Sequence, residues 1–301
     1  MFGFLKGKKK DTDEVLKQDL TDQQMTDSVF VIHLFFENKV CMPSNESIMN
    51  NLSARLGKIE SASYNEKMVS YATLDYVAEF KDGKVPVMLS ILECISTDEF
   101  QVDRVTLSQF WDCPESEEIL SNCKYHVVAV DMMGAGIVDY KKRAKLLCEY
   151  AEALVDLFPE CRAILFQNSG KMYSADDFKT LDVPEDIRFI KYAVNVRFFN
   201  IDGTNDKMVD SLGMRVLNLP DVQYHFRDME PNWVVEHAYN VCSYNYDHDA
   251  PIQSGQTIDG IKNGSMEKSI QWQCQYEDAL IQPVRLVMDI DMKEYAAGQR
   301  G

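Results

Sequence analysis

The stretch SVFVIHLFF, residues 28–36, decides how the folded part of the chain is interpreted. It is almost continuously apolar and rich in β-branched and aromatic residues, as is typical of a strand buried on both faces of a sheet. A helix is expected after it, because apolar residues recur at every fourth position from Ile48 to Leu56 and Gly57 follows. We therefore expect a first central strand followed by an amphipathic helix.

The next residues predict a β-hairpin, a second helix and a further strand. Residues 68–80 and 87–92 read as the two strands of the hairpin, with the turn dipeptide Asp-Gly between them. Pro114 begins a helical segment with an acidic first turn, and residues 125–131, YHVVAVD, read as a strand. The order strand, helix, strand, strand, helix, strand predicts a ferredoxin-like α+β sandwich for this lobe.

The rest of the chain also mixes helices and strands. The elements expected there are a long helix from Asp139 to Phe158, strands over 162–166 and 188–199, a short helix between Thr204 and Gly213, a strand over 222–226, a helix from Pro231, and strands over 270–276 and 284–290. The fold class predicted is α+β, with two sandwich lobes of mostly antiparallel sheets.

Three regions are expected along the chain. Residues 1–27 are predicted to form a flexible basic and polar leader, residues 28–135 an N-terminal lobe and residues 136–301 a C-terminal lobe. The segment Met-Gly-Ala-Gly, residues 133–136, is a natural place for the lobes to meet, because small residues there favour a turn.

The charge balance excludes one class of partner. Asp and Glu number 48 against 31 Lys and Arg, for a net charge of -17, although the first ten residues carry four lysines and no acid. Proteins that bind nucleic acids use Lys and Arg to displace counterions from phosphates, so this chain is not expected to bind DNA or RNA. An acidic surface favours a basic protein partner, and it also keeps a protein soluble.

The cysteines and the N-terminal residues indicate where in the cell the protein is expected. Eight cysteines occur without a C-x-x-C pair, which argues against a zinc or iron–sulfur site and predicts reduced thiols in a cytoplasm. No signal-peptide pattern opens the chain, and no apolar run is long enough for a transmembrane segment. Phe2, Phe4 and Leu5 lie beside the four lysines, but a single short basic segment binds membranes weakly, so membrane contact by this tail is not expected.

Four residues are the candidates for a metal or acid–base site. His225 and His237 lie in the densest polar cluster, and Asp289 and Asp291 are two apart in an expected strand. Imidazole and carboxylate groups suit divalent metals and proton transfer. The spacing of the histidines, however, matches no metal-binding motif, and paired acids most often form the solvent face of a strand. Solvated or packed polar side chains are therefore the simpler interpretation.

No motif for nucleophilic catalysis or nucleotide binding is present. The chain has no G-x-S-x-G elbow, no adjacent Cys and His, and no glycine-rich phosphate loop. No catalytic residue and no cofactor is assigned. Trp233, Tyr239, Tyr244 and Tyr246 are instead candidates for an interaction surface, because Trp and Tyr anchor protein interfaces, with closure of the core as the alternative.

A set of positions within residues 211–260 forms a recognisable pattern: Gly213, Met214, Leu217, Leu219, Pro220, Asp221, Gly255, Thr257 and Ile258. With these residues, the stretch resembles the bacterial domain of unknown function family 4261. The family-like segment spans 205–292, and residues 110–130 and 163–178 are also similar. Gln256 is a departure, because relatives often carry an acid there. The resemblance implies a cytoplasmic bacterial protein of α+β build and no established activity.

Two functional hypotheses follow. The first is a non-enzymatic protein-interaction module with an acidic surface. The alternative is a small-molecule- or metal-dependent enzyme with its site between the lobes, since pockets often form at such interfaces.

Overall fold

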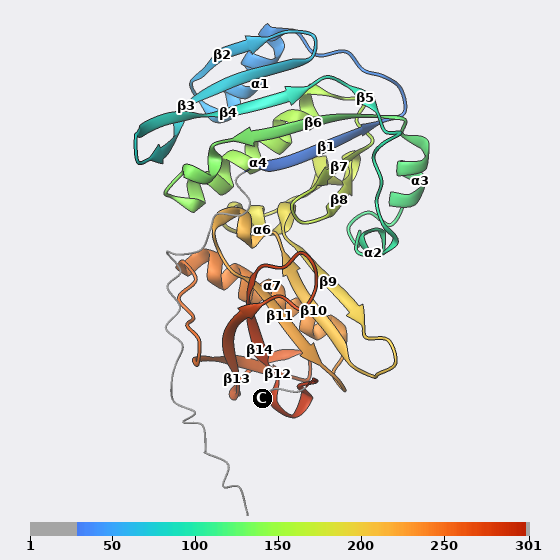
Figure 1. The fold of residues 1–301 in the computed structure, drawn as a ribbon, viewed down its shortest axis with the longest axis vertical. Coiled ribbons are helices and arrows are strands. Elements are labelled where there is room, and N and C mark those ends of the chain that lie inside the picture. Colours follow the sequence, from blue (N-terminus) through green and yellow to red (C-terminus); the bar gives the residue numbers. More distant parts are fainter. Residues whose placement is uncertain (1–28, 299–301) are drawn as a thin grey trace, which may run out of the picture.

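The computed structural model describes residues 29–298, and the leader expected over residues 1–27 lies outside them. Two lobes, each built around one β-sheet, are stacked along the long axis of the molecule (Figure 1). The predicted α+β class with mostly antiparallel sheets is confirmed. Within the described residues, no helix is long and apolar enough to cross a bilayer.

The first sheet contains the N-terminal strands. They are β1 (Phe30–Phe36), β2 (Ile59–Tyr64), β3 (Met68–Phe80), β4 (Gly83–Leu92), β5 (Ile95–Ser96), β6 (Tyr125–Met132), β7 (Ala163–Phe166) and β8 (Lys171–Ser174). The order is β2-β3-β4-β6-β1-β7-β8, and β5 pairs with β6. The stretch SVFVIHLFF supplies β1, which is buried along almost its whole length between β6 and β7.

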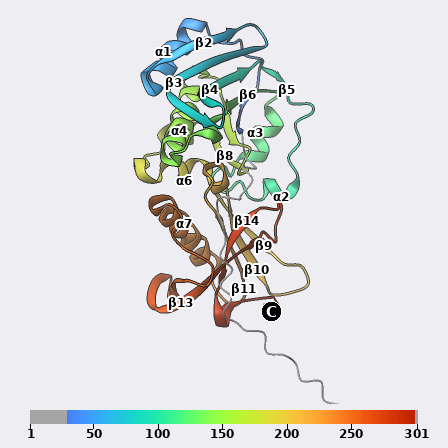
Figure 2. The same ribbon diagram turned by 60° about the vertical axis from the view of Figure 1, so that its left-hand side comes forward.

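Helices lie on both sides of this sheet (Figure 2). Those on the main core face are α1 (Asn45–Leu56), α4 (Tyr140–Leu157), α5 (Ala175–Thr180) and α6 (Arg188–Ala193), and those on the other side are α2 (Arg104–Leu107) and α3 (Ser116–Asn122). The predicted helix around Ile48 is α1. Ser44 caps its first turn by accepting a hydrogen bond from Ser47 N at 3.2 Å, and Gly57 follows it with φ of 81°.

The second sheet contains the C-terminal strands. They are β9 (Asn195–Asn200), β10 (Lys207–Leu212), β11 (Asp221–Phe226), β12 (Thr257–Lys262), β13 (Ser265–Asp278) and β14 (Leu286–Asp291). The order is β12-β13-β14-β11-β10-β9, in which β11 and β14 are parallel. The long helix α7 (Pro231–His248) covers one face. It begins at Pro231, as predicted.

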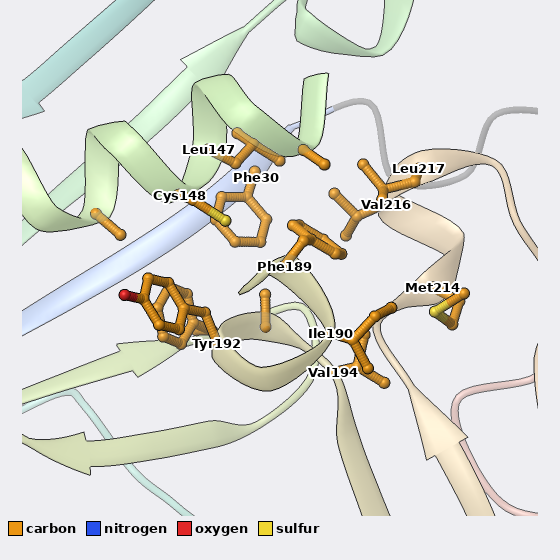
Figure 3. Close-up of a cluster of buried hydrophobic side chains, with 14 of the residues drawn as sticks. Phe30, Leu147, Cys148, Phe189, Ile190, Tyr192, Val194, Met214, Val216 and Leu217 are labelled. Carbon is orange, nitrogen blue, oxygen red and sulfur yellow. The ribbon is translucent and has the colours of Figure 1, made fainter. Parts of the chain in front are cut away.

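One continuous apolar core joins the two lobes. Phe30 and Leu147 of the first lobe lie in the same cluster as Phe189 of α6 and Val216 and Leu217 of the second lobe (Figure 3). Polar contacts cross the same junction, and the Tyr140 hydroxyl donates to the carbonyl oxygen of Tyr246 at 2.5 Å. The lobes therefore share a buried interface.

Two predicted elements are wrong. Residues 188–193 form helix α6 instead of a strand, because Phe189, Ile190, Tyr192 and Ala193 present one buried helical face between the lobes. The segment expected as a helix between Thr204 and Gly213 contains strand β10, which is paired with β9 on one side and β11 on the other.

The ferredoxin-like detail of the first lobe is unconfirmed. Its sheet has additional strands, and every strand pair described in it is antiparallel, whereas helical crossovers between neighbouring strands produce parallel pairs. The sheet also continues through β7 and β8, although residues 163–174 are expected in the second lobe. We propose a boundary between the lobes within residues 175–194, where the chain passes from one sheet to the other.

Candidate functional site

An open groove of about 800 Å³ lies between α7 and the first half of β12. We call it the α7–β12 groove. Its apolar lining residues are Val241, Tyr244, Pro251, Ile252, Ile258 and Met266, and its polar ones are Asn240, Gln256, Thr257 and Asp259. Tyr244 is 47% exposed and Met266 is 50% exposed. Two large apolar side chains thus remain accessible to solvent at the same place.

Helix α7 presents one wall of the groove because its two faces differ. The face toward the sheet carries the buried side chains Val234, Ala238, Val241 and Cys242. The opposite face carries exposed residues at helical spacing, and Tyr244 belongs to it. Glu230 caps the start of the helix. Asp249 follows its last residue, and the left-handed φ of 58° at Asp249 turns the chain back toward the sheet.

The loop between α7 and β12 is fixed by hydrogen bonds to β13. The Tyr276 hydroxyl donates to the carbonyl oxygen of Ile252 at 2.9 Å, and Tyr276 N donates to Ser254 Oγ at 3.0 Å. Gly255 N donates to the carbonyl oxygen of Cys274 at 2.8 Å, with a φ of 87° that favours glycine. The wall formed by this loop is therefore held in place without a ligand.

Strand β12 forms the edge of the second sheet. Within residues 29–298 it pairs with β13 alone, and its register shifts between Asp259 and Gly260. Backbone groups of alternate residues in an antiparallel edge strand point away from the neighbouring strand. The groove thus combines accessible apolar side chains with an edge that can accept another strand.

His237, one of the four metal or acid–base candidates, connects α7 to this edge. Its Nε2 lies 2.8 Å from the carbonyl oxygen of Asp259, and its Nδ1 lies 2.8 Å from the hydroxyl of Tyr224. Burial lowers the pKa of His237 and keeps the imidazole neutral, although the bond to Asp259 opposes this. In that state Nε2–H donates to Asp259 and Nδ1 accepts from Tyr224. Both ring nitrogens are occupied, so no lone pair is free for a metal.

The other three candidates lie on the opposite side of the second sheet from His237. Their neighbours in sequence, such as Tyr224 and Ile290, belong to the core on the α7 side, so alternation directs His225, Asp289 and Asp291 to the other face. His225 Nε2 lies 3.5 Å from Asp206, Asp289 accepts from Gln223 at 3.2 Å, and Asp291 accepts from Lys293 N at 2.9 Å.

The structure therefore does not bring the four candidates together. In the part of the chain that is described, no group of three or more His, Cys, Asp or Glu side chains is placed to hold a metal ion.

The four aromatic candidates also separate. Tyr246 is buried, with its ring 5.7 Å from that of Tyr140, and Tyr239 is half-buried and accepts a hydrogen bond from Lys171 at 3.1 Å. Trp233, 37% exposed, packs against Gly264 and does not line the groove. Of the four, Tyr244 lines the α7–β12 groove.

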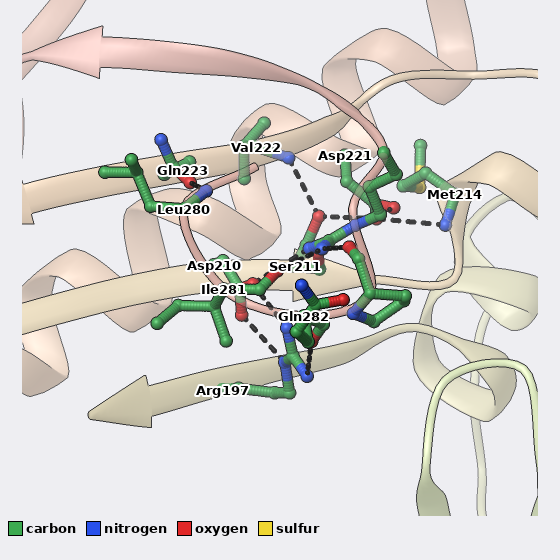
Figure 4. A network of polar contacts seen from close by, with 12 residues as sticks. Arg197, Asp210, Ser211, Met214, Asp221, Val222, Gln223, Leu280, Ile281 and Gln282 are labelled. Carbon is green, nitrogen blue, oxygen red and sulfur yellow. Dashed lines mark hydrogen bonds and ion pairs between the residues drawn. The ribbon is translucent and has the colours of Figure 1, made fainter. Parts of the chain in front are cut away.

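A buried ion network beside β14 was not anticipated from the sequence (Figure 4). Arg285 donates to Asp210 at 2.8 Å and to Asp221 at 3.0 Å, and Arg197 also donates to Asp210. Burial raises the pKa of Asp221, while the guanidinium of Arg285 opposes that rise. Ser211 and Met214 N donate to the other oxygen of Asp221. The network anchors the loop before β14 and is inaccessible to a ligand.

A second cavity, of about 740 Å³, lies in the first lobe between α2 and α3 and is lined by Phe35 and Phe100. Phe100 packs over two buried histidines, with ring centroids 5.1 Å from His33 and 5.5 Å from His126. Their Nδ1 atoms are 3.2 Å apart, and His33 Nε2 lies 2.7 Å from Gln167 Oε1. The sequence places both histidines in expected strands, 28–36 and 125–131, and suggests no function for either.

Residues 210–291 match the model of a family described as Domain of unknown function (DUF4261). The match confirms a DUF4261-like domain and falls within the segment that the sequence resemblance covers. The α7–β12 groove and the Asp210–Arg285–Asp221 network both lie inside it. Neither the curated proteins nor the solved structures contain a match to the chain.

Proposed function

We propose that the DUF4261-like domain is a protein-interaction module, and that it binds an extended segment of a partner protein in the α7–β12 groove. The observation that carries the proposal is the combination of an edge strand with an open apolar groove beside it. In β-strand addition, main-chain hydrogen bonds to an edge strand supply affinity and adjacent pockets for alternate side chains supply specificity. Here β12 is the edge, and Tyr244, Ile258 and Met266 form the pocket.

The edge carries little of the usual protection against strand pairing, although the carbonyl oxygen of Asp259 is already bonded by His237. Natural edge strands are commonly blocked by lysine, proline or a covering loop. The groove half of β12, Thr257 to Asp259, contains no lysine or proline, and Lys262 is at the far end of the strand. An accessible edge beside exposed Tyr244 and Met266 is a liability unless it serves binding.

The charge around the groove supports a basic partner. Asp259 lines the groove, whereas no lysine or arginine among residues 29–298 does. Glu236 and Asp247 are exposed on α7, and the whole chain carries -17. Complementary charges at the rim of an interface mainly increase the association rate and make it depend on salt. We therefore propose a segment in which apolar residues alternate with lysine or arginine.

A reducing, cytoplasmic setting belongs to the same proposal. It is supported by the eight cysteines, which are all free thiols and, apart from Cys41, buried.

The test is a selection from a displayed library of random linear peptides against the full chain. Selected peptides are expected to carry basic and β-branched residues, and on binding to change the amide NMR signals of Thr257 to Asp259. Ile258→Lys is expected to abolish binding, because it places a cation in the pocket. Selected peptides that bind the Ile258→Lys variant unchanged, or a library without binders, would refute the proposal.

A further inference from the structure

One face of the first sheet is only partly covered. In β1, β4 and β6, every second side chain, such as Ile32, Leu89 and Val127, lies in the main core with α4. Alternation places their neighbours on the other face. The apolar ones among them that lie away from α2 and α3 are Val31, Met88, Leu92, Val128, Val130 and Met132, and we call these six the open face. The Ser90 hydroxyl lies 3.7 Å from Met132 Sδ, which confirms that β4 and β6 share this face.

The segment that contains α2 and α3 covers the other part of this face. It packs on Phe35, Leu165 and Met172, which form a small second core. None of the open-face residues belongs to either core or is packed against one of them, among the residues described. Met132 is 43% exposed, and Met68, at the end of β3, is 38% exposed. An apolar sheet surface of this kind usually marks a contact site.

We propose that the leader of the same chain, residues 1–27, packs on the open face. The chain enters β1 through Val29, which is itself exposed and lies two residues before Val31 of the open face. Asn168 fixes this entry point, because it donates to the carbonyl oxygen of Val29 at 3.0 Å and accepts from Val31 N at 2.9 Å. The leader therefore starts at the edge of the surface that it covers.

The leader has the length and the side chains for this contact. The apolar residues of the leader nearest to the entry point are Met25, Leu20, Leu16 and Val15. An extended chain spans about 3.3 Å per residue and strands lie about 4.8 Å apart, so the stretch between Leu20 and Val29 suffices to cross several strands.

A tethered segment also has an advantage over other occupants. Its effective concentration is in the millimolar range for a short linker, so weak contacts suffice. A second copy of the chain would bring another net charge of -17 against the first, which opposes association. The proposal does not depend on the α7–β12 groove, which lies in the other lobe.

Methionine oxidation tests the proposal, because Met68 and Met132 lie on or beside the open face. The full chain and a chain that begins at Ser28 are treated with hydrogen peroxide, and sulfoxide formation is followed by mass spectrometry. Removal of the leader is expected to increase the oxidation rate of Met132 several-fold. Met266, which is 50% exposed in the other lobe, serves as the internal control and is expected to be unchanged.

A matched pair of full-length variants distinguishes the loss of apolar contacts of the leader from the effect of added negative charge. Leu16→Asp/Leu20→Asp is expected to reproduce the effect of the truncation, whereas Gln18→Asp/Gln23→Asp adds the same charge and is expected to leave Met132 protected. Equal oxidation of Met132 in all four proteins would overturn the proposal. If Met132 stays protected in the chain without the leader and light scattering gives a dimeric mass, a second copy covers the open face. This result would also overturn the proposal.

Discussion

The Nε2 atom of His237 lies 2.8 Å from the carbonyl oxygen of Asp259, so one imidazole joins α7 to the strand that forms the other wall of the α7–β12 groove. The same ring bonds the hydroxyl of Tyr224 and lies 5.1 Å from the ring of Trp272. A residue that suggested metal chemistry in the sequence thus holds the two walls of the groove at a fixed distance. The geometry of the groove depends on a side chain that does not line it.

Replacing His237 is expected to destabilise the second lobe. His237→Ala removes a buried ring and leaves the hydroxyl of Tyr224 and the carbonyl of Asp259 without their partner. Each unsatisfied buried group costs about 1–3 kcal/mol, so we expect a loss of about 2–5 kcal/mol in the free energy of unfolding, measured with urea. His248→Ala, at an exposed position on the same helix, is the control. A loss below about 0.5 kcal/mol for His237→Ala would contradict the role assigned to this ring.

Stability is expected to fall in mild acid because of the buried histidines of the first lobe. Burial lowers the pKa of His126 to about 4, with a further contribution from His33, and burial also lowers the pKa of His33. Between about pH 6.5 and pH 4 the unfolded chain therefore binds protons that the folded chain does not. This contribution is fully present above pH 6.5 and is lost as the pH falls toward 4.

Urea midpoints at pH 7.5, 6.0 and 5.0 measure the effect of these histidines. His126→Phe keeps an aromatic ring beside Phe35 and Phe100 but removes the proton site. Its midpoint is expected to fall less over this range than that of the unaltered chain. Parallel curves for the two proteins would show that His126 is not responsible.

The residues of the buried ion network are expected to contribute to the stability of the folded protein in a coupled, non-additive way. Arg285→Met leaves Asp210 and Asp221 in the interior without their shared guanidinium, and breaking a buried pair in this way typically costs about 3–5 kcal/mol. Arg285→Lys is expected to restore little, because one ammonium group does not match two carboxylates that bind different nitrogens. Adding Asp221→Asn to Arg285→Met is expected to recover part of the loss. Additive losses in the double variant, measured by thermal unfolding, would argue against a coupled network.

The local pattern of the sequence predicts local structure well. The helical spacing that ends at Gly57 and the proline that opens α7 at Pro231 both act over a few residues, and both predictions are confirmed. One strand is expected over 188–199, but residues 188–193 form helix α6. Phe189 and Tyr192 pack there between two lobes whose arrangement no local pattern contains. Tertiary packing there overrides propensity.

The candidate site is predicted less well, because its contacts join distant parts of the chain. Tyr244 was selected for its residue type, but nothing in the sequence places Ile258 and Met266 beside it. His237 and Asp289 were grouped by chemistry, yet the second sheet separates them, since alternation in β14 decides which side chains face α7.

Binding in the groove is expected to distinguish two exposed aromatic residues of α7. Tyr244 lines the groove, whereas Trp233 packs on Gly264 outside it. Central interface aromatics contribute about 2 kcal/mol or more, so Tyr244→Ala is expected to weaken a selected peptide by more than about tenfold. Trp233→Ala, which removes a larger ring from the same helix, is expected to change the affinity by less than about threefold. Fluorescence anisotropy with one labelled peptide measures both, and the reverse order of effects would move the binding surface from the groove to the start of α7.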